Sequence, residues 1–127
     1  MKVFILVMLL GAFSVSAQDN VRLTDDQYNV LRKDILENYS KHPLDAISRA
    51  SEYLRKYDVQ FSPRQKLRMY YTKAYFQIQA ETFADAFATL AICKRLADEV
   101  NDLNLTFYYH GYMAGMLNTL ENYELFL

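Results

Sequence analysis

The side chains of this chain that could do chemistry are few and far apart. Its two histidines, His42 and His110, stand in different parts of the sequence, and neither has a cysteine, a second histidine or a carboxylate at the spacing of metal ligands. Because a zinc site needs three or four such ligands, we expect no metal site and no cofactor. His42 precedes Pro43 and is predicted to start a helix. His110 is predicted to pack between helices, with a ligand-binding or catalytic role as the alternative.

Cys93 is the single cysteine, and a thiol becomes a strong nucleophile when a neighbouring cation or a helix N-terminus lowers its pKa. It stands on an apolar stripe with Ala86 and Leu90 at helical spacing, which predicts a buried small residue instead. The sequence contains no phosphate-binding glycine loop, nucleophile elbow or paired-carboxylate motif. We therefore expect that the protein is not an enzyme. The alternative, a hydrolase or a protein that binds a small ligand, would have to rest on His110 and Tyr109.

The chain contains eleven tyrosines, and many of them stand in two stretches, 70–75 and 108–112. A tyrosine joins an apolar ring to a polar hydroxyl, so it can fill a core or line a binding surface at low entropic cost. The sequence leaves both interpretations open. The answer depends on the elements that carry these residues.

Every strong local signal after residue 20 is a helix signal. Thr24 and Gln27 form a capping-box pattern, and Ser62 and Gln65 repeat it, with Pro63 at the first helical position. Apolar residues recur at helical spacing between these points, and no alternating run predicts a strand. The sequence therefore predicts an all-α fold. The predicted helices cover 24–40, 43–57, 63–80, 83–99 and 103–120, and a further helix begins near 122.

The sequence also has an internal period of forty residues. Asp45 recurs as Asp85, Ala74 recurs as Ala114, and the predicted breaks between helices follow the same period. Two interleaved sets of breaks indicate a repeated pair of helices, and one pair cannot bury its apolar face unless neighbouring pairs stack. Small residues such as Ala114 are expected to let the helices approach closely, and aromatic residues such as Phe107 to fill the spaces between them.

In the first predicted pair, mainly Asp45 and Ala46 follow the repeat pattern. In the second and third pairs, a small residue stands in the first helix and an aromatic residue begins the second helix. These residues are Ala74, Phe83 and then Ala86 in one pair, and Ala114 and Tyr123 in the next. In this pattern the chain resembles the tetratricopeptide repeats. The resemblance implies antiparallel helix pairs stacked into a right-handed α-solenoid, here with about two and a half repeats. The period of forty exceeds the usual 34 or so residues, which implies longer helices. Other helical repeats with two helices per unit are the alternative.

In tetratricopeptide-repeat proteins the first helices line a concave groove that binds extended peptides or partner helices. The resemblance therefore implies a protein or peptide partner for this chain. The residues that fall on the groove positions are Arg68, Tyr71, Tyr75, Gln79, Tyr108 and Asn118. The alternative is that the tyrosines only fill space between long helices.

Residues 1–17 have the order of a secretory signal peptide. Lys2 gives a positive start, an apolar run follows to Phe13, and Ala17 ends a stretch of small residues after which we expect cleavage. The run is too short for a transmembrane helix. We therefore expect residues 18–127 to form one domain in the bacterial periplasm or outside the cell. With a formal net charge of −1, the chain is not predicted to bind nucleic acid, because phosphate contacts need a basic surface.

Together these features predict an exported protein–protein or peptide interaction module. The chain resembles the periplasmic sensing region of bacterial regulators in which such repeats precede a membrane helix and a cytoplasmic signalling domain, so membrane contact would come only through a downstream segment. Residues 125–127 are apolar and uncapped, which predicts an interrupted repeat that continues in missing sequence or is covered by a partner. The alternative is a free-standing periplasmic scaffold or assembly protein that forms a homo-oligomer through its C-terminal end.

Overall fold

The computed structural model describes residues 21–126, with side chains described as far as Asn122. Over this range the chain forms α-helices joined by short turns and no β-strand, so the predicted all-α fold is confirmed. The helices are α2 (Asp25–Asn38), α3 (Pro43–Lys56), α4 (Pro63–Gln79), α5 (Phe83–Val100) and α6 (Leu103–Phe126). The predicted signal peptide, residues 1–17, lies outside the described residues.

Two capping boxes set the residues at which α2 and α4 begin. The Thr24 hydroxyl accepts from the Gln27 amide at 3.1 Å, and the Gln27 side chain accepts from the Thr24 N–H at 2.9 Å. Ser62 and Gln65 make the same reciprocal pair at 3.1 and 3.0 Å, as predicted. The Gln65 side chain also donates to the Leu23 carbonyl at 2.9 Å. The start of α4 is therefore tied to the start of α2.

The turns after α4 and α5 each contain a residue with left-handed backbone. Glu81 has a φ of 61° and Asn101 a φ of 56°, and both stand where breaks are predicted. Asn adopts this conformation readily, whereas at Glu81 the side chain makes it costly. Asp102 then precedes α6, where its carboxylate accepts from the Asn104 and Leu105 amides at 2.9 and 3.3 Å. The Asp102 side chain therefore caps the start of α6.

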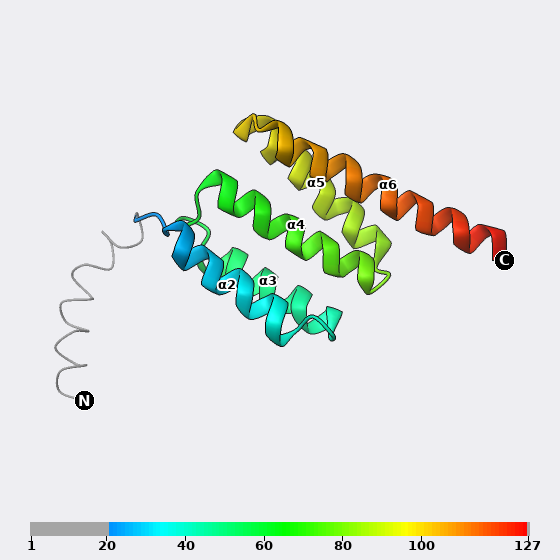
Figure 1. Ribbon diagram of the computed structural model, residues 1–127, viewed down its shortest axis with the longest axis horizontal. Helices are drawn as coiled ribbons and strands as arrows, with labels where there is room; N and C mark the ends of the chain where they lie inside the picture. Colours follow the sequence, from blue (N-terminus) through cyan, green and yellow to red (C-terminus); the bar gives the residue numbers. More distant parts are fainter. Residues whose placement is uncertain (1–20, 127) are drawn as a thin grey trace.

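Successive helices run in opposite directions and form two layers (Figure 1). The helices α2, α4 and α6 lie in one layer in that order, and α3 and α5 lie behind them. The central element is α4, because it contacts each of the other four described helices, whereas the backbones of α2 and α6 as described stay apart. A site shared by α2 and α6 must therefore be bridged by α4.

Two buried clusters lie on either side of α4. The first joins α2, α3 and α4 and includes the fully buried rings of Tyr28 and Phe76. The second joins α4, α5 and α6 and includes Leu90 and Cys93, whose predicted burial is confirmed. The half-buried Tyr70 packs against both clusters. Because α4 supplies side chains to both, it holds the two halves of the molecule together.

The last helix contradicts several predictions. It continues for 24 residues from Leu103 to Phe126, so the predicted break at 121–122 and the separate helix beyond it are wrong. The segment 119–124 contains no Gly or Pro, and a growing helix meets no signal to stop there. Ala114 and Phe107, predicted to pack between helices, are exposed, because α6 turns Met116 toward the core instead. Neither α6 nor any other described helix is long and apolar enough to cross a membrane.

Candidate functional site

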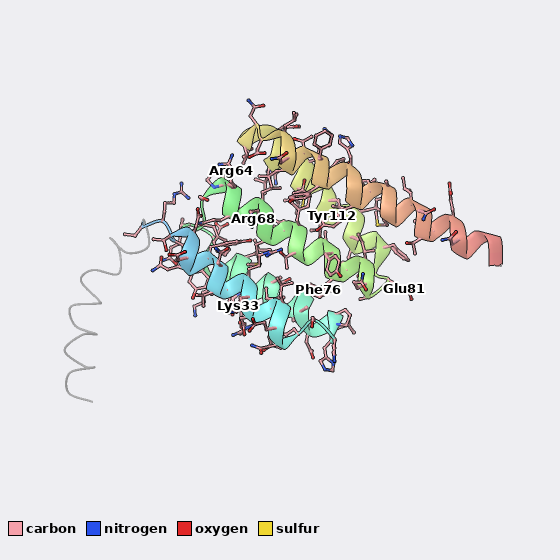
Figure 2. All side chains as sticks on the ribbon, in the orientation of Figure 1. Lys33, Arg64, Arg68, Phe76, Glu81 and Tyr112 are labelled. Carbon is pink, nitrogen blue, oxygen red and sulfur yellow. The ribbon has the colours of Figure 1, made fainter. Side chains whose placement is uncertain are left out.

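One cavity lies between α2, α4 and α6, the three helices of one layer, and measures about 220 Å³. Its lining residues are Arg32 from α2, Arg68, Tyr71 and Thr72 from α4, and Tyr108 and Tyr112 from α6. Figure 2 shows Arg68 on α4 and Tyr112 on α6. The cavity thus gathers two guanidinium groups and three phenol rings.

Arg32 and Arg68 give the cavity a positive charge. Both side chains are half-buried, and among residues 21–122 neither forms an ion pair with a carboxylate. The Arg68 guanidinium lies over the Tyr28 ring, 5.5 Å from its centroid, and this cation–π contact helps to hold it in place. Two guanidinium groups that no carboxylate of residues 21–122 neutralises attract an anionic group into such a recess.

Tyr71 forms the fixed wall of the cavity. It is 4% exposed, and its hydroxyl donates to the Leu105 carbonyl in the first turn of α6. The Tyr108 ring stands edge-on to it with the centroids 5.9 Å apart, and the Tyr112 ring is tilted against it at 5.4 Å. Burial is the main reason that the pKa of both Tyr71 and Tyr112 is raised. These phenols are therefore neutral at ordinary pH and bring no negative charge to the cavity.

The structure brings some of the predicted groove residues together and leaves others apart. Three of them line the cavity: Arg68, Tyr71 and Tyr108. Tyr75 is 42% exposed one turn further along α4, with its ring against Phe76. Gln79 is exposed at the end of α4, and Asn118 is exposed on the second half of α6. That these residues contact a ligand stays a prediction.

The cavity lining also includes three residues that were not predicted to line the groove: Arg32, Thr72 and Tyr112. The internal period of the sequence nevertheless relates all three. They are spaced forty residues apart, so they occupy one register position on α2, α4 and α6. The positions four residues earlier form a second set: Tyr28, Arg68 and Tyr108. Residues four apart share a helix face. Five of the six residues in these two rows line the cavity, and the sixth, the buried Tyr28, has its ring against the Arg68 guanidinium.

A second polar cluster, on α2 and α3, joins these two helices. The Asp34 carboxylate accepts from the Tyr53 hydroxyl at 2.6 Å and from the Arg49 guanidinium at 3.2 Å. The hydrogen bond from Tyr53 is the main reason that the pKa of Asp34 lies below its ordinary value. Arg49 also pairs with Glu52 and lies over the Tyr53 ring, 4.8 Å from its centroid. Because these charged groups already have partners, we assign the cluster a structural role.

The histidines and the cysteine are not among the residues that line the cavity. His42 is the N-cap of α3, as predicted. His110 is exposed on α6 with its ring 5.3 Å from that of Tyr109, so the prediction that it packs between helices is wrong. Burial raises the pKa of the Cys93 thiol to about 12, which makes it a poor nucleophile. In the described part of the chain, no three His, Cys, Asp or Glu residues are grouped so that they could hold a metal ion.

Comparisons of the chain with models of protein families, with curated proteins and with solved structures give no match. The likeness to tetratricopeptide repeats therefore rests on the residues and the period of this chain alone. The function is inferred from the chemistry of the cavity.

Proposed function

We propose that this protein is an exported helical-repeat module that binds a peptide or protein segment on the face formed by α2, α4 and α6. The main support for the proposal is the spacing of the lining residues, because residues forty positions apart on three helices line the same space. In a right-handed α-solenoid of the tetratricopeptide type, equivalent positions of the first helices form one concave surface. The position of α4 between α2 and α6 agrees with such a stack.

The size of the cavity favours a side chain of a longer segment over a free small molecule. Pockets for drug-sized ligands usually measure about 300–1,000 Å³, whereas this cavity measures about 220 Å³. A space of that size holds one or two side chains. A peptide along the layer could place one side chain here and continue past Tyr75 and Gln79, which are exposed further along α4.

The charge of the cavity favours a carboxylate. A guanidinium group can bind a carboxylate through two parallel hydrogen bonds, and Arg32 and Arg68 have no carboxylate partner among residues 21–122. The neutral phenols of Tyr71 and Tyr112 do not repel such a group. Tyr108 is 56% exposed and offers its ring to an apolar neighbour. We infer a segment in which Asp, Glu or a terminal carboxylate adjoins an apolar residue.

A binding role without catalysis fits the side chains of the cavity. Arginine and a tyrosine of raised pKa are poor general bases near neutral pH. The Thr72 hydroxyl donates to the Arg68 carbonyl at 3.0 Å, so no neighbouring base activates it. The signal-peptide pattern of residues 1–17 supports a periplasmic location, which suits the sensing part of a signalling protein. The alternative, a free-standing scaffold that oligomerises, is favoured by the exposed face of α6.

Fluorescence anisotropy with the exported chain and labelled peptides tests the binding function. Three peptides share one apolar sequence and carry Glu, Gln or Lys at the central position. We expect the Glu peptide to bind about tenfold or more tightly than the Gln peptide, because hydrogen bonds to charged groups contribute about 1.5–3 kcal/mol. Arg32→Ala and Arg68→Ala should each remove most of this preference. Arg55→Ala, on the exposed surface of α3, is the matched control and should bind like the wild type.

Two results would contradict the proposal. One is equal affinity for the Glu, Gln and Lys peptides. The other is a preference for Glu that persists unchanged in both Arg32→Ala and Arg68→Ala, because the carboxylate would then bind elsewhere.

A further inference from the structure

One face of α6 is apolar and uncovered. A helix that is apolar on all sides, as α6 is, is normally enclosed. Only α4 and α5 contact it in the described chain, and Figure 1 shows it at the edge of the molecule, with its C-terminal part running past the N-terminal end of α5. Leu103, Phe107 and Leu117 are 75%, 64% and 47% exposed. Large apolar side chains in one row mark an interaction surface.

The exposed residues of this row have the spacing of a seam between two packed helices. They follow one another at intervals of four, three, four, three and four positions: Leu103, Phe107, His110, Ala114, Leu117 and Glu121. That alternation is the heptad spacing of helices that pack along their lengths. We call these six residues the α6 outer face. It lies opposite the buried Met116, and it does not include the cavity residues Tyr108 and Tyr112.

Gly111 adjoins the middle of the α6 outer face, and packing within the chain does not require a glycine there. A Cβ added at this position would meet nothing within 4 Å, and the residue does not have a positive φ. A glycine inside a helix weakens that helix relative to alanine. Close approach of another backbone is the usual benefit that offsets this loss. Gly111 and Ala114 therefore leave room for a second helix to approach α6 closely.

The charge pattern favours a second copy of this chain as the partner. Between Leu103 and Leu120, α6 contains no Asp, Glu, Lys or Arg. The α6 outer face has one charged residue, Glu121 at its end, so it offers little to a partner that is recognised by charge. It does suit a two-fold interface, in which the same patch of both copies meets and a charged patch would repel itself.

We propose that two copies of this chain form an antiparallel dimer through the α6 outer face. If the two-fold axis crosses α6 at the level of residue 112, positions whose numbers average 112 face each other. Phe107 then packs on Leu117 of the second copy, and His110 on Ala114 of the second copy. Gly111 lies beside the axis, where the two backbones come closest. This proposal is independent of peptide binding in the cavity.

The surface available is sufficient for a reversible dimer. Taking about 200 Å² for a fully exposed Leu or Phe side chain, Leu103, Phe107 and Leu117 together expose about 370 Å² per copy. Two copies would bury about 740 Å² from these side chains alone. The exposed residues between them add to this area and bring the pair toward the roughly 1,200 Å² of the smallest stable interfaces. We therefore expect a weak and reversible dimer, because interfaces below about 1,200 Å² are typical of transient association.

Sedimentation equilibrium of the full exported chain, over micromolar to submillimolar concentrations, tests the dimer. The wild type should move from monomer to dimer across this range. Phe107→Glu and Ala114→Arg place charges on the α6 outer face and should remain monomeric, with unchanged circular dichroism and melting, because both residues are exposed. Leu44→Glu is the matched control, because Leu44 is 65% exposed on α3 and its replacement should leave the dimer intact.

Disulfide trapping tests the register separately. Copies with Phe107→Cys mixed with copies with Leu117→Cys should give a mixed disulfide dimer, whereas either variant alone should crosslink far less. A wild type that stays monomeric at every concentration would overturn the proposal. Dimers that persist in Phe107→Glu and Ala114→Arg, or crosslinking that is equal in the single variants and the mixture, would overturn it as well.

Discussion

Two buried tyrosines in the cluster that joins α2, α3 and α4 differ in whether the hydroxyl has a hydrogen-bond partner. Tyr53 donates to the Asp34 carboxylate at 2.6 Å, whereas the Tyr28 hydroxyl has no hydrogen-bond partner among the described residues. Burial is the main reason that the pKa of each is raised to about 12. A buried hydroxyl without a hydrogen-bond partner lowers the stability of the fold. A buried hydroxyl with a partner raises it, because removal of that hydroxyl would leave the partner unpaired. The two hydroxyls should therefore contribute to stability with opposite signs.

Replacement of each tyrosine by phenylalanine tests this difference. Tyr28→Phe should leave the free energy of unfolding unchanged or raise it by up to about 1 kcal/mol, because it removes an unpaired hydroxyl. Tyr53→Phe should lower it by about 1–2 kcal/mol, because a hydrogen bond to a charged carboxylate is lost. Urea unfolding at neutral pH, followed by circular dichroism, measures both. A larger loss in Tyr28→Phe than in Tyr53→Phe would show that the assignment is wrong.

The same hydrogen bond gives the stability a pH dependence. The pKa of Asp34 is lower in the folded chain than its ordinary value, so its charged form stabilises the fold. This contribution is present above the unfolded pKa of about 3.9 and is lost as the pH falls through the folded value. The penalty of Tyr53→Phe should therefore shrink as the pH falls through about 4 and below, while the effect of Tyr28→Phe stays constant. Urea unfolding across this range would contradict the account if the penalty of Tyr53→Phe grew at low pH.

At the scale of the elements, the helix ends explain which boundaries the sequence could predict. The capping boxes at Thr24 and Ser62 are local patterns, and they set the starts of α2 and α4 as predicted. No capping pattern stands at the predicted end of α6. The forty-residue period alone predicted a break at 121–122, where the helix continues. The exposed side of α6 also could not be predicted. Met116 rather than Ala114 faces the core because of how α6 lies against α5, a contact between distant positions.

Glu81 follows the end of α4, and glutamate is not the residue type best suited to its backbone conformation. Its φ of 61° costs a residue with a Cβ about 1–2 kcal/mol, and glycine avoids that cost. Glu81→Gly should therefore raise the free energy of unfolding by about 1 kcal/mol. Asn101→Gly, at a φ of 56°, is the matched control and should gain less, because Asn tolerates left-handed backbone. Thermal unfolding measures both, and a lower melting temperature for Glu81→Gly would contradict this account.

At the scale of the whole molecule, α4 joins two clusters and bridges the helices that share the cavity. Arg68, Tyr71 and Tyr108 could be predicted as neighbours because the family resemblance assigns them to one surface. The family resemblance did not assign Arg32 to this surface, because the repeat motifs are weak in the first helix pair. Its position forty residues before Thr72 was the available signal. The absence of a carboxylate partner for Arg32 among residues 21–122 depends on contacts between helices, and no pattern in the sequence reports those contacts.

A double-mutant cycle tests most directly the central claim that this cavity binds a carboxylate. Dissociation constants of the wild type and of Arg68→Ala are measured with the Glu peptide and with the Gln peptide. We predict a coupling free energy of at least about 1 kcal/mol between Arg68 and the peptide carboxylate. The same cycle with Arg55→Ala should give a coupling near zero. Binding in all four combinations with no coupling to Arg68 would contradict the claim.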